Sequence, residues 1–206
     1  MPKQKKNTKL KKTSKKSKSS KKSKIITDYL DLGVIMTPEE CKVVADEILE
    51  YRNLGIVNDE PDKNYYNKSQ GGIVPSSYDY MGKFLPLVRE LTGREVVFAN
   101  PFCRIYNNTS TLNPHTDRDL LDWTISVCVK TDINWDWPLK MRTESKETVS
   151  FPTTIGYASL VRGNVYTHWR EPLVCDDDQN VICMFLHYTD PENPALEQEI
   201  PTTSNE

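Results

Sequence analysis

Three histidines are present in the 206-residue chain, and two of them lie where the neighbouring residue types suit metal binding. His115 and Asp117 form a His-x-Asp pair, and His168 follows far downstream. Two imidazoles and one carboxylate cover one face of an octahedral Fe(II) ion and leave the opposite face open to reactants. The three residues therefore predict an iron centre that can hold other molecules beside the metal.

The spacing of the pair suits a β-strand. Side chains alternate along a strand, so His115 and Asp117 would point to the same side of a sheet and chelate one ion. His168 would complete the site from another strand. Two simpler interpretations compete: His115 and Asp117 as a hydrogen-bonded surface pair, and His168 as a buried histidine beside Trp169.

Charge is distributed unevenly along the chain. Residues 1–24 contain 12 lysines and no acid, so the remainder has 27 − 12 = 15 basic against 29 acidic residues, a net charge of −14. The composition of this tail predicts a disordered segment. Three roles stay open for it: weak binding of nucleic acid or another polyanion, a nuclear address, or solubilisation of an acidic body.

The cysteine pattern bears on the compartment. Five cysteines without a Cys-x-x-Cys spacing argue against a disulfide framework or a zinc knuckle and fit a reducing interior. No apolar run is long enough for a signal peptide or a membrane span. We therefore expect an intracellular protein, cytoplasmic or possibly nuclear in a eukaryote, without a membrane partner.

Residues 25–93 predict a helical support region that starts with a short strand at 25–35. Thr37 can cap a helix and Glu40 completes a capping box, with Pro38 in the favourable first position. The apolar residues that follow have helical spacing: Cys41, Val44, Ala45, Ile48 and Leu49.

A second helix is expected from about Tyr78 to Thr92, because apolar residues again recur at helical spacing. Pro86 inside it predicts a kink or a restart, and Gly93 ends it. Residues 53–77, between the two helices, are rich in polar residues and predict a long loop.

From Glu95 the pattern changes to short β-type runs separated by turn residues. These runs are 96–98, 103–106, 123–129, 158–161, 165–169 and 181–188. No helical periodicity interrupts them, which predicts antiparallel strands in a sandwich or barrel. The expected fold is mainly β with N-terminal helices, a double-stranded β-helix (jelly roll). Its core would span 94–192, followed by a flexible tail at 193–206.

Alternation sorts the side chains of the run from Trp123 to Lys130. One set, Ile125, Val127 and Val129, predicts packing against helices; the other set, Thr124, Ser126, Cys128 and Lys130, predicts a pocket wall that ends in a cation. Tyr166, His168 and Arg170 share a face in the same way.

Six segments of the chain occur in an order that is typical of one superfamily. They are Arg104-x-Tyr106, Leu112-x-x-His115-x-Asp117, Ile125-Ser126-Val127, Trp137-Pro138-Leu139, the run from His168 to Leu173, and Phe185-Leu186-His187-Tyr188. Together they resemble the Fe(II)/2-oxoglutarate-dependent oxygenases, which include the prolyl hydroxylases, over about residues 25–190. The resemblance implies that His115, Asp117 and His168 bind Fe(II), with 2-oxoglutarate as cosubstrate and O2 as oxidant.

The chain departs from the superfamily at the cation that binds the far carboxylate of 2-oxoglutarate. Many members place it about ten residues after the distal His, but positions 176–180 read Asp-Asp-Asp-Gln-Asn. Some members use a lysine on the strand after the His-x-Asp motif, and Lys130 fits that role. Arg170 is the second candidate, and Tyr106 would hydrogen-bond the cosubstrate.

Other interpretations of these residues stay open. Arg104 and Arg162 are further candidates for the cation, each of the four cations also suits a surface position or a salt bridge, and Tyr106 also suits a half-buried strand position.

The resemblance favours an Fe(II)- and 2-oxoglutarate-dependent dioxygenase that hydroxylates a protein side chain, such as proline, or a small molecule. One alternative is a nucleic-acid oxidative demethylase, which the basic tail supports and the acidic remainder opposes. Another is a non-catalytic cupin-like binding module, which the missing cation supports. The presence of all three triad residues opposes that last alternative.

Overall fold

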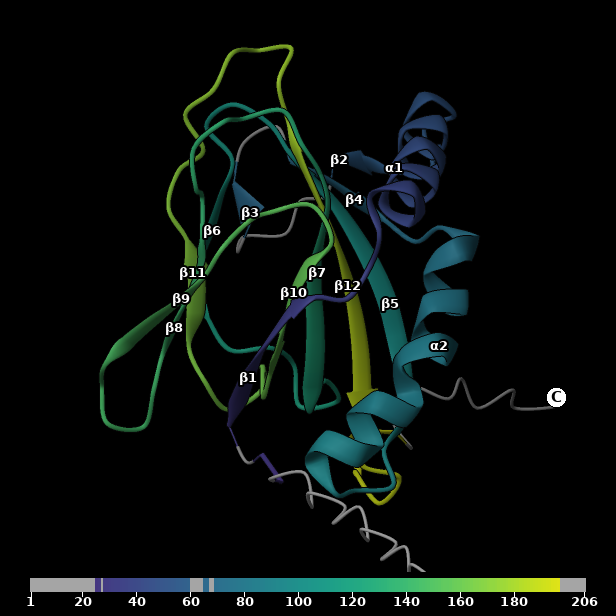
Figure 1. Ribbon diagram of the computed structural model, residues 1–206, viewed down its shortest axis with the longest axis vertical. Helices are drawn as coiled ribbons and strands as arrows, with labels where there is room; N and C mark the ends of the chain where they lie inside the picture. Colours follow the sequence, from purple (N-terminus) through teal and green to yellow (C-terminus); the bar gives the residue numbers. More distant parts are fainter. Residues whose placement is uncertain (1–24, 27, 60–64, 67–68, 197–206) are drawn as a thin grey trace, which may run out of the picture.

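A computed structural model (Figure 1) describes residues 25–26, 28–59, 65–66 and 69–196. Two antiparallel sheets face each other, and two helices, α1 (Pro38–Asn53) and α2 (Pro75–Thr92), pack on the outer side of the larger sheet. The predicted fold, mainly β with N-terminal helices, is confirmed. The predictions for residues 1–24 and for most of the C-terminal tail fall outside the described residues.

The larger sheet has seven strands. In spatial order they are β1 (Tyr29–Val34), β10 (Tyr157–Val161), β7 (Trp123–Thr131), β12 (Val181–Thr189), β5 (Val97–Tyr106), β4 (Gln70–Gly72) and β2 (Asn58–Asp59). The smaller sheet has five. Their order is β3 (Tyr65–Tyr66), β6 (Thr111–His115), β11 (His168–Arg170), β8 (Leu139–Arg142) and β9 (Thr148–Phe151).

The start of α1 confirms the capping box. Thr37 Oγ1 accepts a hydrogen bond from the Glu40 backbone N–H (3.2 Å), and Glu40 Oε2 accepts one from the Thr37 N–H (2.9 Å). α2 begins three residues earlier than predicted, at Pro75, and Gly93 ends it in a left-handed conformation. Pro86 lies inside α2 without ending it, so the predicted restart is absent there.

The predicted loop at 53–77 is wrong in part. Within it, β2 and β4 extend the larger sheet and β3 pairs with β6 in the smaller one. These strands have two or three residues each, too few for a period-two pattern to show in the sequence. Residues 25–93 therefore supply strands to both sheets as well as the two helices.

Register across the central strands defines the inner face of the larger sheet. Phe185 of β12 lies opposite Phe102 of β5 on one side and Ser126 of β7 on the other. The alternate residues of these strands, such as Ile125 and Met184, are buried against the helices. The helix-facing set predicted for β7 is therefore confirmed, and the opposite face is free to build a site.

Neither described helix is long and apolar enough to cross a membrane.

Candidate active site

The three predicted metal ligands meet between the sheets. His115, the last residue of β6, is paired in register with His168, the first residue of β11, and their ring centroids are 4.4 Å apart. One oxygen of Asp117, Oδ1, lies 3.6 Å from His115 Nε2 and 3.4 Å from His168 Nε2. All three ligand atoms lie within 4.8 Å of one another, which suits one metal ion.

Asp117 is not on a strand, in contrast to the expectation for the His-x-Asp pair, because β6 ends at His115. Other contacts position it instead. Its backbone N–H donates to the Gly163 carbonyl (2.8 Å), and Thr124 Oγ1 donates to its Oδ2 (3.1 Å). Gly163 leaves room for the carboxylate, since an added Cβ there would lie 1.8 Å from Oδ2.

Backbone carbonyls orient both imidazoles. Nδ1 of His115 lies 2.8 Å from the Asn113 carbonyl oxygen, and Nδ1 of His168 lies 3.0 Å from that of Tyr166. A carbonyl only accepts, so each Nδ1 carries the proton and donates it. Each Nε2 then directs its lone pair toward Asp117, as in metal-binding histidines whose second nitrogen is held by the protein.

Electrostatics inside the triad favour a bound cation. Burial opposes ionisation of Asp117, but its close contacts with His115 and His168 hold the pKa of its carboxyl well below the usual range. Burial lowers the pKa of His168, and the nearby Asp117 carboxylate more than offsets this and raises it. The carboxylate thus stabilises positive charge at this point, and a divalent ion can supply it.

A cavity of about 440 Å³ adjoins the triad. Both sheets line it, with Arg104 and Phe102 from β5, Phe185 and His187 from β12, and Leu112 from β6. Its size falls in the range of pockets that hold small molecules.

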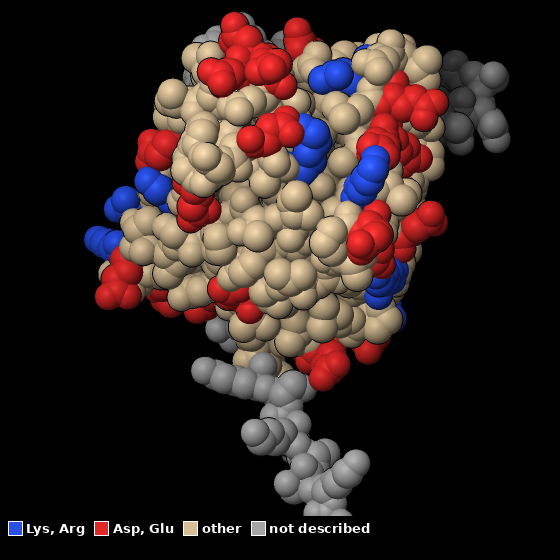
Figure 2. Space-filling model, turned by 45° about the horizontal axis from the view of Figure 1, so that its top comes forward, with Lys and Arg blue, Asp and Glu red and all other residues tan. Residues whose placement is uncertain are grey.

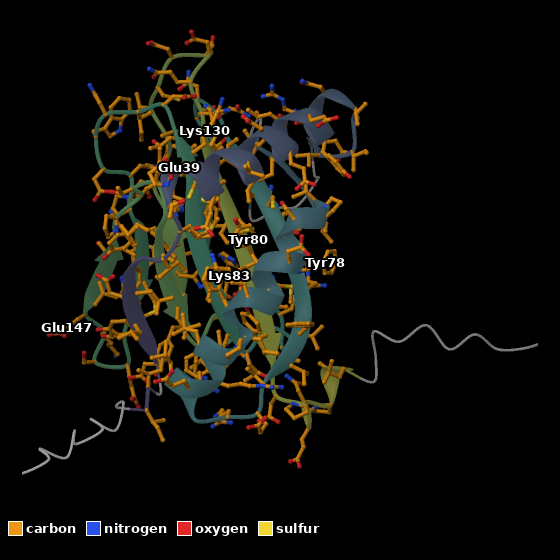
Figure 3. The ribbon with its side chains drawn as sticks, turned by 45° about the vertical axis from the view of Figure 1, so that its right-hand side comes forward. Glu39, Tyr78, Tyr80, Lys83, Lys130 and Glu147 are labelled. Carbon is orange, nitrogen blue, oxygen red and sulfur yellow. The ribbon has the colours of Figure 1, made fainter. Side chains whose placement is uncertain are left out.

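Lys130, the first candidate for the cosubstrate carboxylate, is not among the described residues that line this cavity. It lies near the end of β7 (Figure 3), where its Nζ contacts Asp132 and donates to Asn180 Oδ1 at 3.0 Å. The register explains the displacement. Cys183 pairs with Cys128 but Ile182 pairs with Lys130, so Val129 is an extra residue in β7.

Arg170, the second candidate, is buried between the sheets with 4% of its surface exposed. Its Nη1 donates to the Trp137 carbonyl and to Thr153 Oγ1, both at 2.7 Å, and its Nη2 lies 3.8 Å from Cys183 Sγ. Its buried Nε has no hydrogen-bond partner in the described part of the chain. Nor does any described carboxylate form an ion pair with it.

Aromatic rings surround the Arg170 guanidinium. It lies 4.8 Å from the centroid of the Trp137 ring and 5.9 Å from that of Tyr106. The Tyr106 side chain is fully buried in this cluster and does not appear in the wall of the cavity. Arg170 is also absent from the described residues that line the cavity, so Tyr106 and Arg170 are brought together in a buried cluster between the sheets, and Lys130 lies outside it.

Sequence reasoning gave too little weight to two residues of the cavity wall. Arg104 was only a distant candidate, yet it is completely buried and lines the cavity. His187 was given no role of its own, yet it lines the cavity while its Nδ1 contacts the Asn100 carbonyl. The available signal was alternation, since Arg104 shares a strand face with Tyr106, and His187 with Phe185.

No protein-family model matches the sequence, and no curated protein matches it significantly. Solved structures do match. A prolyl-4-hydroxylase from Pseudomonas putida has a TM-score of 0.61 at 10% identity, over 79% of this chain and 92% of that one. A Trichoplax adhaerens prolyl hydroxylase, in complex with a peptide of the hypoxia inducible factor, has a TM-score of 0.65 at 11% identity, over 82% and 86%.

HygX from Streptomyces hygroscopicus, with nickel and 2-oxoglutarate bound, has a TM-score of 0.62 at 9% identity, over 81% of this chain and 84% of that one. The chain therefore has the double-stranded β-helix fold of the Fe(II)/2-oxoglutarate oxygenases, as the sequence predicted. At these identities the likeness shows the fold, and function has to be argued from the site.

Proposed function

We propose that the protein is an Fe(II)- and 2-oxoglutarate-dependent dioxygenase that hydroxylates a small molecule or a protein side chain. One observation carries the proposal: two Nε2 atoms and a carboxylate oxygen meet at one point beside a cavity. That donor set suits non-haem Fe(II) with open positions. HygX, which shares the fold, holds nickel and 2-oxoglutarate.

The triad fits iron because both histidines carry their proton on Nδ1, away from the metal position. With Nδ1 of His115 and of His168 donating to carbonyls, each Nε2 has the lone pair with which an imidazole binds a metal ion. Asp117 stays ionised, and the Thr124 hydroxyl and the Gly163 carbonyl fix its position. Bound iron, 2-oxoglutarate and O2 would supply the oxidising power that a protein side chain lacks.

Arg170 fits the far carboxylate of 2-oxoglutarate. A guanidinium binds a carboxylate through paired N–H groups, and here one buried N–H, that of Nε, has no partner among the described residues. Arg170 lies two residues beyond His168 on the same strand face, about 7 Å along β11. Its positive charge also acts on the His168 imidazole, so it is close to the triad. Tyr106 lies beside it.

Lys130 remains the alternative for this carboxylate. For Lys130 to bind this carboxylate, its Nζ would have to leave Asp132 and Asn180 and turn toward the cavity. We favour Arg170 because it already lies between the sheets.

The proposal names two classes of substrate, a protein side chain and a small molecule. Two of the proteins that share the fold are prolyl hydroxylases, and one of them holds a peptide. The cavity size also suits a small molecule. The demethylase alternative gains no support from the surface in Figure 2, where acidic and basic side chains are interspersed.

The test is an anaerobic titration of Fe(II)-loaded protein with 2-oxoglutarate, followed by the weak visible absorption band of the chelate. We expect a band in the wild type and none in His168→Ala. The matched control is His187→Gln, which changes the one histidine outside the triad and should keep the band. Iron bound without any band would favour the cupin-like module, and wild-type iron content in His115→Ala would refute the triad.

Turnover separates the enzyme from a binding module. Aerobic incubation with 2-oxoglutarate should release succinate, and a substrate should accelerate it. A peptide library and methylated oligonucleotides, tested side by side, distinguish hydroxylation from demethylation.

A further inference from the structure

Two polar side chains of the cavity wall have no part in the proposed binding of iron and 2-oxoglutarate. His187 of β12 and Asn100 of β5 both line the cavity, from neighbouring strands of the larger sheet. Nδ1 of His187 lies 2.6 Å from the Asn100 backbone oxygen, so the two residues meet. They are close to the triad, because Thr124, which donates to Asp117, is paired in register with His187.

The contact with Asn100 fixes the proton of His187. A carbonyl oxygen only accepts, so Nδ1 donates, and Nε2 of the neutral ring keeps its lone pair. Burial lowers the pKa of His187, so the ring is neutral at pH 7. Only 7% of the residue is exposed, and Nε2 forms no hydrogen bond in the described part of the chain. A side chain of the cavity wall therefore has an acceptor to offer.

Asn100 adds a second acceptor at the same place. Its Oδ1 is buried and has no hydrogen-bond partner among the described residues. Buried polar atoms of folded proteins nearly always have a partner, and an acceptor that lacks one destabilises the fold. Two such side chains in contact with each other, both in the wall of one cavity, indicate that a bound molecule supplies the donor.

The wall around these two residues is mostly apolar. The Phe185 ring is stacked near the His187 ring, with 6.5 Å between the centroids, and Phe185 lies opposite Phe102 of β5. Leu112 and Leu139 line the cavity from the smaller sheet. Such a wall binds an apolar body and uses a few polar groups to orient it. A neutral donor suits it better than a charged one, because burial of a charge without an ionic partner is costly.

We propose that the substrate is a largely apolar molecule with a hydroxyl or amide N–H group beside its reacting carbon, and that Nε2 of His187 accepts a hydrogen bond from this group. Asn100 is the second acceptor. A molecule without the donor leaves both acceptors buried and unpaired, and a site built in this way rejects it. The inference rests on the proposed function, since it places the reacting carbon at the triad.

The experiment uses Mn(II) in place of iron, with saturating 2-oxoglutarate, so that no turnover occurs. Paramagnetic Mn(II) broadens the NMR signals of molecules that bind near it, and a titration gives their affinity. The probes are cyclohexanol and N-cyclohexylacetamide, each compared with a methylated counterpart that lacks the donor, methoxycyclohexane or N-cyclohexyl-N-methylacetamide. We expect at least one donor probe to bind about tenfold more tightly than its counterpart. The pair that differs distinguishes a hydroxyl site from an amide site.

Two variants of His187 separate hydrogen bonding from shape. His187→Phe removes the acceptor but keeps a planar ring beside Phe185, and the preference for the donor probe should vanish. His187→Gln supplies an acceptor, Oε1, and should retain most of the preference. If His187→Phe folds poorly because the Asn100 carbonyl loses its donor, Asn100→Ala takes its place. That variant keeps the carbonyl and His187 but lacks the second acceptor, so the preference should fall severalfold.

Specific outcomes overturn the inference. Equal affinity for each donor probe and its counterpart, or no broadening of any probe in the wild type, would show that the cavity does not select a donor. An unchanged preference in His187→Phe, or in Asn100→Ala where that variant takes its place, would assign the selection to another group. A lower affinity for 2-oxoglutarate in His187→Phe, with probe binding unchanged, would make His187 a cosubstrate contact. The proposed function fails by a different result, the absence of an Fe(II)–2-oxoglutarate band in the wild type.

Discussion

Replacing Arg170 by methionine separates a role in cosubstrate binding from a role in folding. The methionine fills much of the same space between Trp137 and Tyr106 without the charge. A buried charge without a carboxylate partner destabilises a fold by several kcal/mol, and an apolar replacement is often neutral or stabilising. The Trp137 carbonyl keeps Thr153 Oγ1 as a donor. We therefore expect the Tm of the metal-free protein to stay the same or to rise.

The cosubstrate should show the opposite effect. If Arg170 binds the far carboxylate of 2-oxoglutarate in this buried place, removal of the guanidinium leaves that carboxylate without its partner. Loss of one member of a buried charge pair costs about 2–5 kcal/mol. At about 1.4 kcal/mol for each factor of ten, the Kd for 2-oxoglutarate should rise about 30-fold to 4,000-fold. Iron should still bind, because all three of its ligands remain.

The assay is the anaerobic titration of Fe(II)-loaded protein with 2-oxoglutarate, and the matched control is Lys130→Met. An unchanged Kd in Arg170→Met would refute the argument. If the Kd rose in Lys130→Met instead, the lysine would be the anchor. A strongly lowered Tm together with an unchanged Kd would show that Arg170 only supports the fold.

Three other predictions concern the rest of the chain. Gly163→Ala should weaken iron binding about tenfold or more, because the added Cβ would lie 1.8 Å from the Asp117 carboxylate. The control is Gly82→Ala, where an added Cβ meets nothing within 4 Å, and metal analysis measures the iron content of both variants. Burial raises the pKa of Asp122, but the hydrogen bonds that its carboxylate accepts lower the pKa overall; the donors are the Asp190 backbone N–H and the side chains of Asn193, Thr189 and Asn164. The stabilisation by this carboxylate is therefore full above the unfolded pKa of about 3.9 and is lost as the pH falls through the folded pKa. Asp122→Asn should therefore reduce the free energy of unfolding by about 1 kcal/mol at neutral pH and by less near pH 3, as denaturant titrations at both pH values would show. Deleting residues 1–24, outside the described part of the chain, should abolish salt-sensitive binding to a polyanion, and persistence of that binding would place it elsewhere.

The strands that sequence reasoning predicted best are the long central ones, because nine residues make an alternating pattern that a single run can show. β7 and β12 belong to this kind, and their alternation correctly separated Val127, toward the helices, from Ser126, toward the cavity. β8 and β9 of the smaller sheet have four residues each and were not predicted. Their residues become a strand pair only through a partner that is distant in the sequence, and no local pattern reports that partner.

The same distinction explains which site residues could be read from the sequence. The triad was predictable because histidine is rare in this chain and its spacing to an aspartate matches a known ligand set. The position of Lys130 was not predictable, since alternation was extrapolated one residue too far along β7. The extra residue Val129 breaks the alternation before Lys130, and the bulge is visible only in the pairing with β12.

Arg170 became the stronger candidate only when its surroundings were known. The sequence shows only that Arg170 is one of several cations and that its spacing from His168 puts both residues on the same face of a strand. What distinguishes it is the combination of burial, neutral hydrogen-bond partners and an Nε without a partner among the described residues, a combination that a folded protein rarely keeps without a use for it. HygX shares the fold at 9% identity, but the burial of Arg170 and its hydrogen-bond partners can be seen only in the structure of this chain.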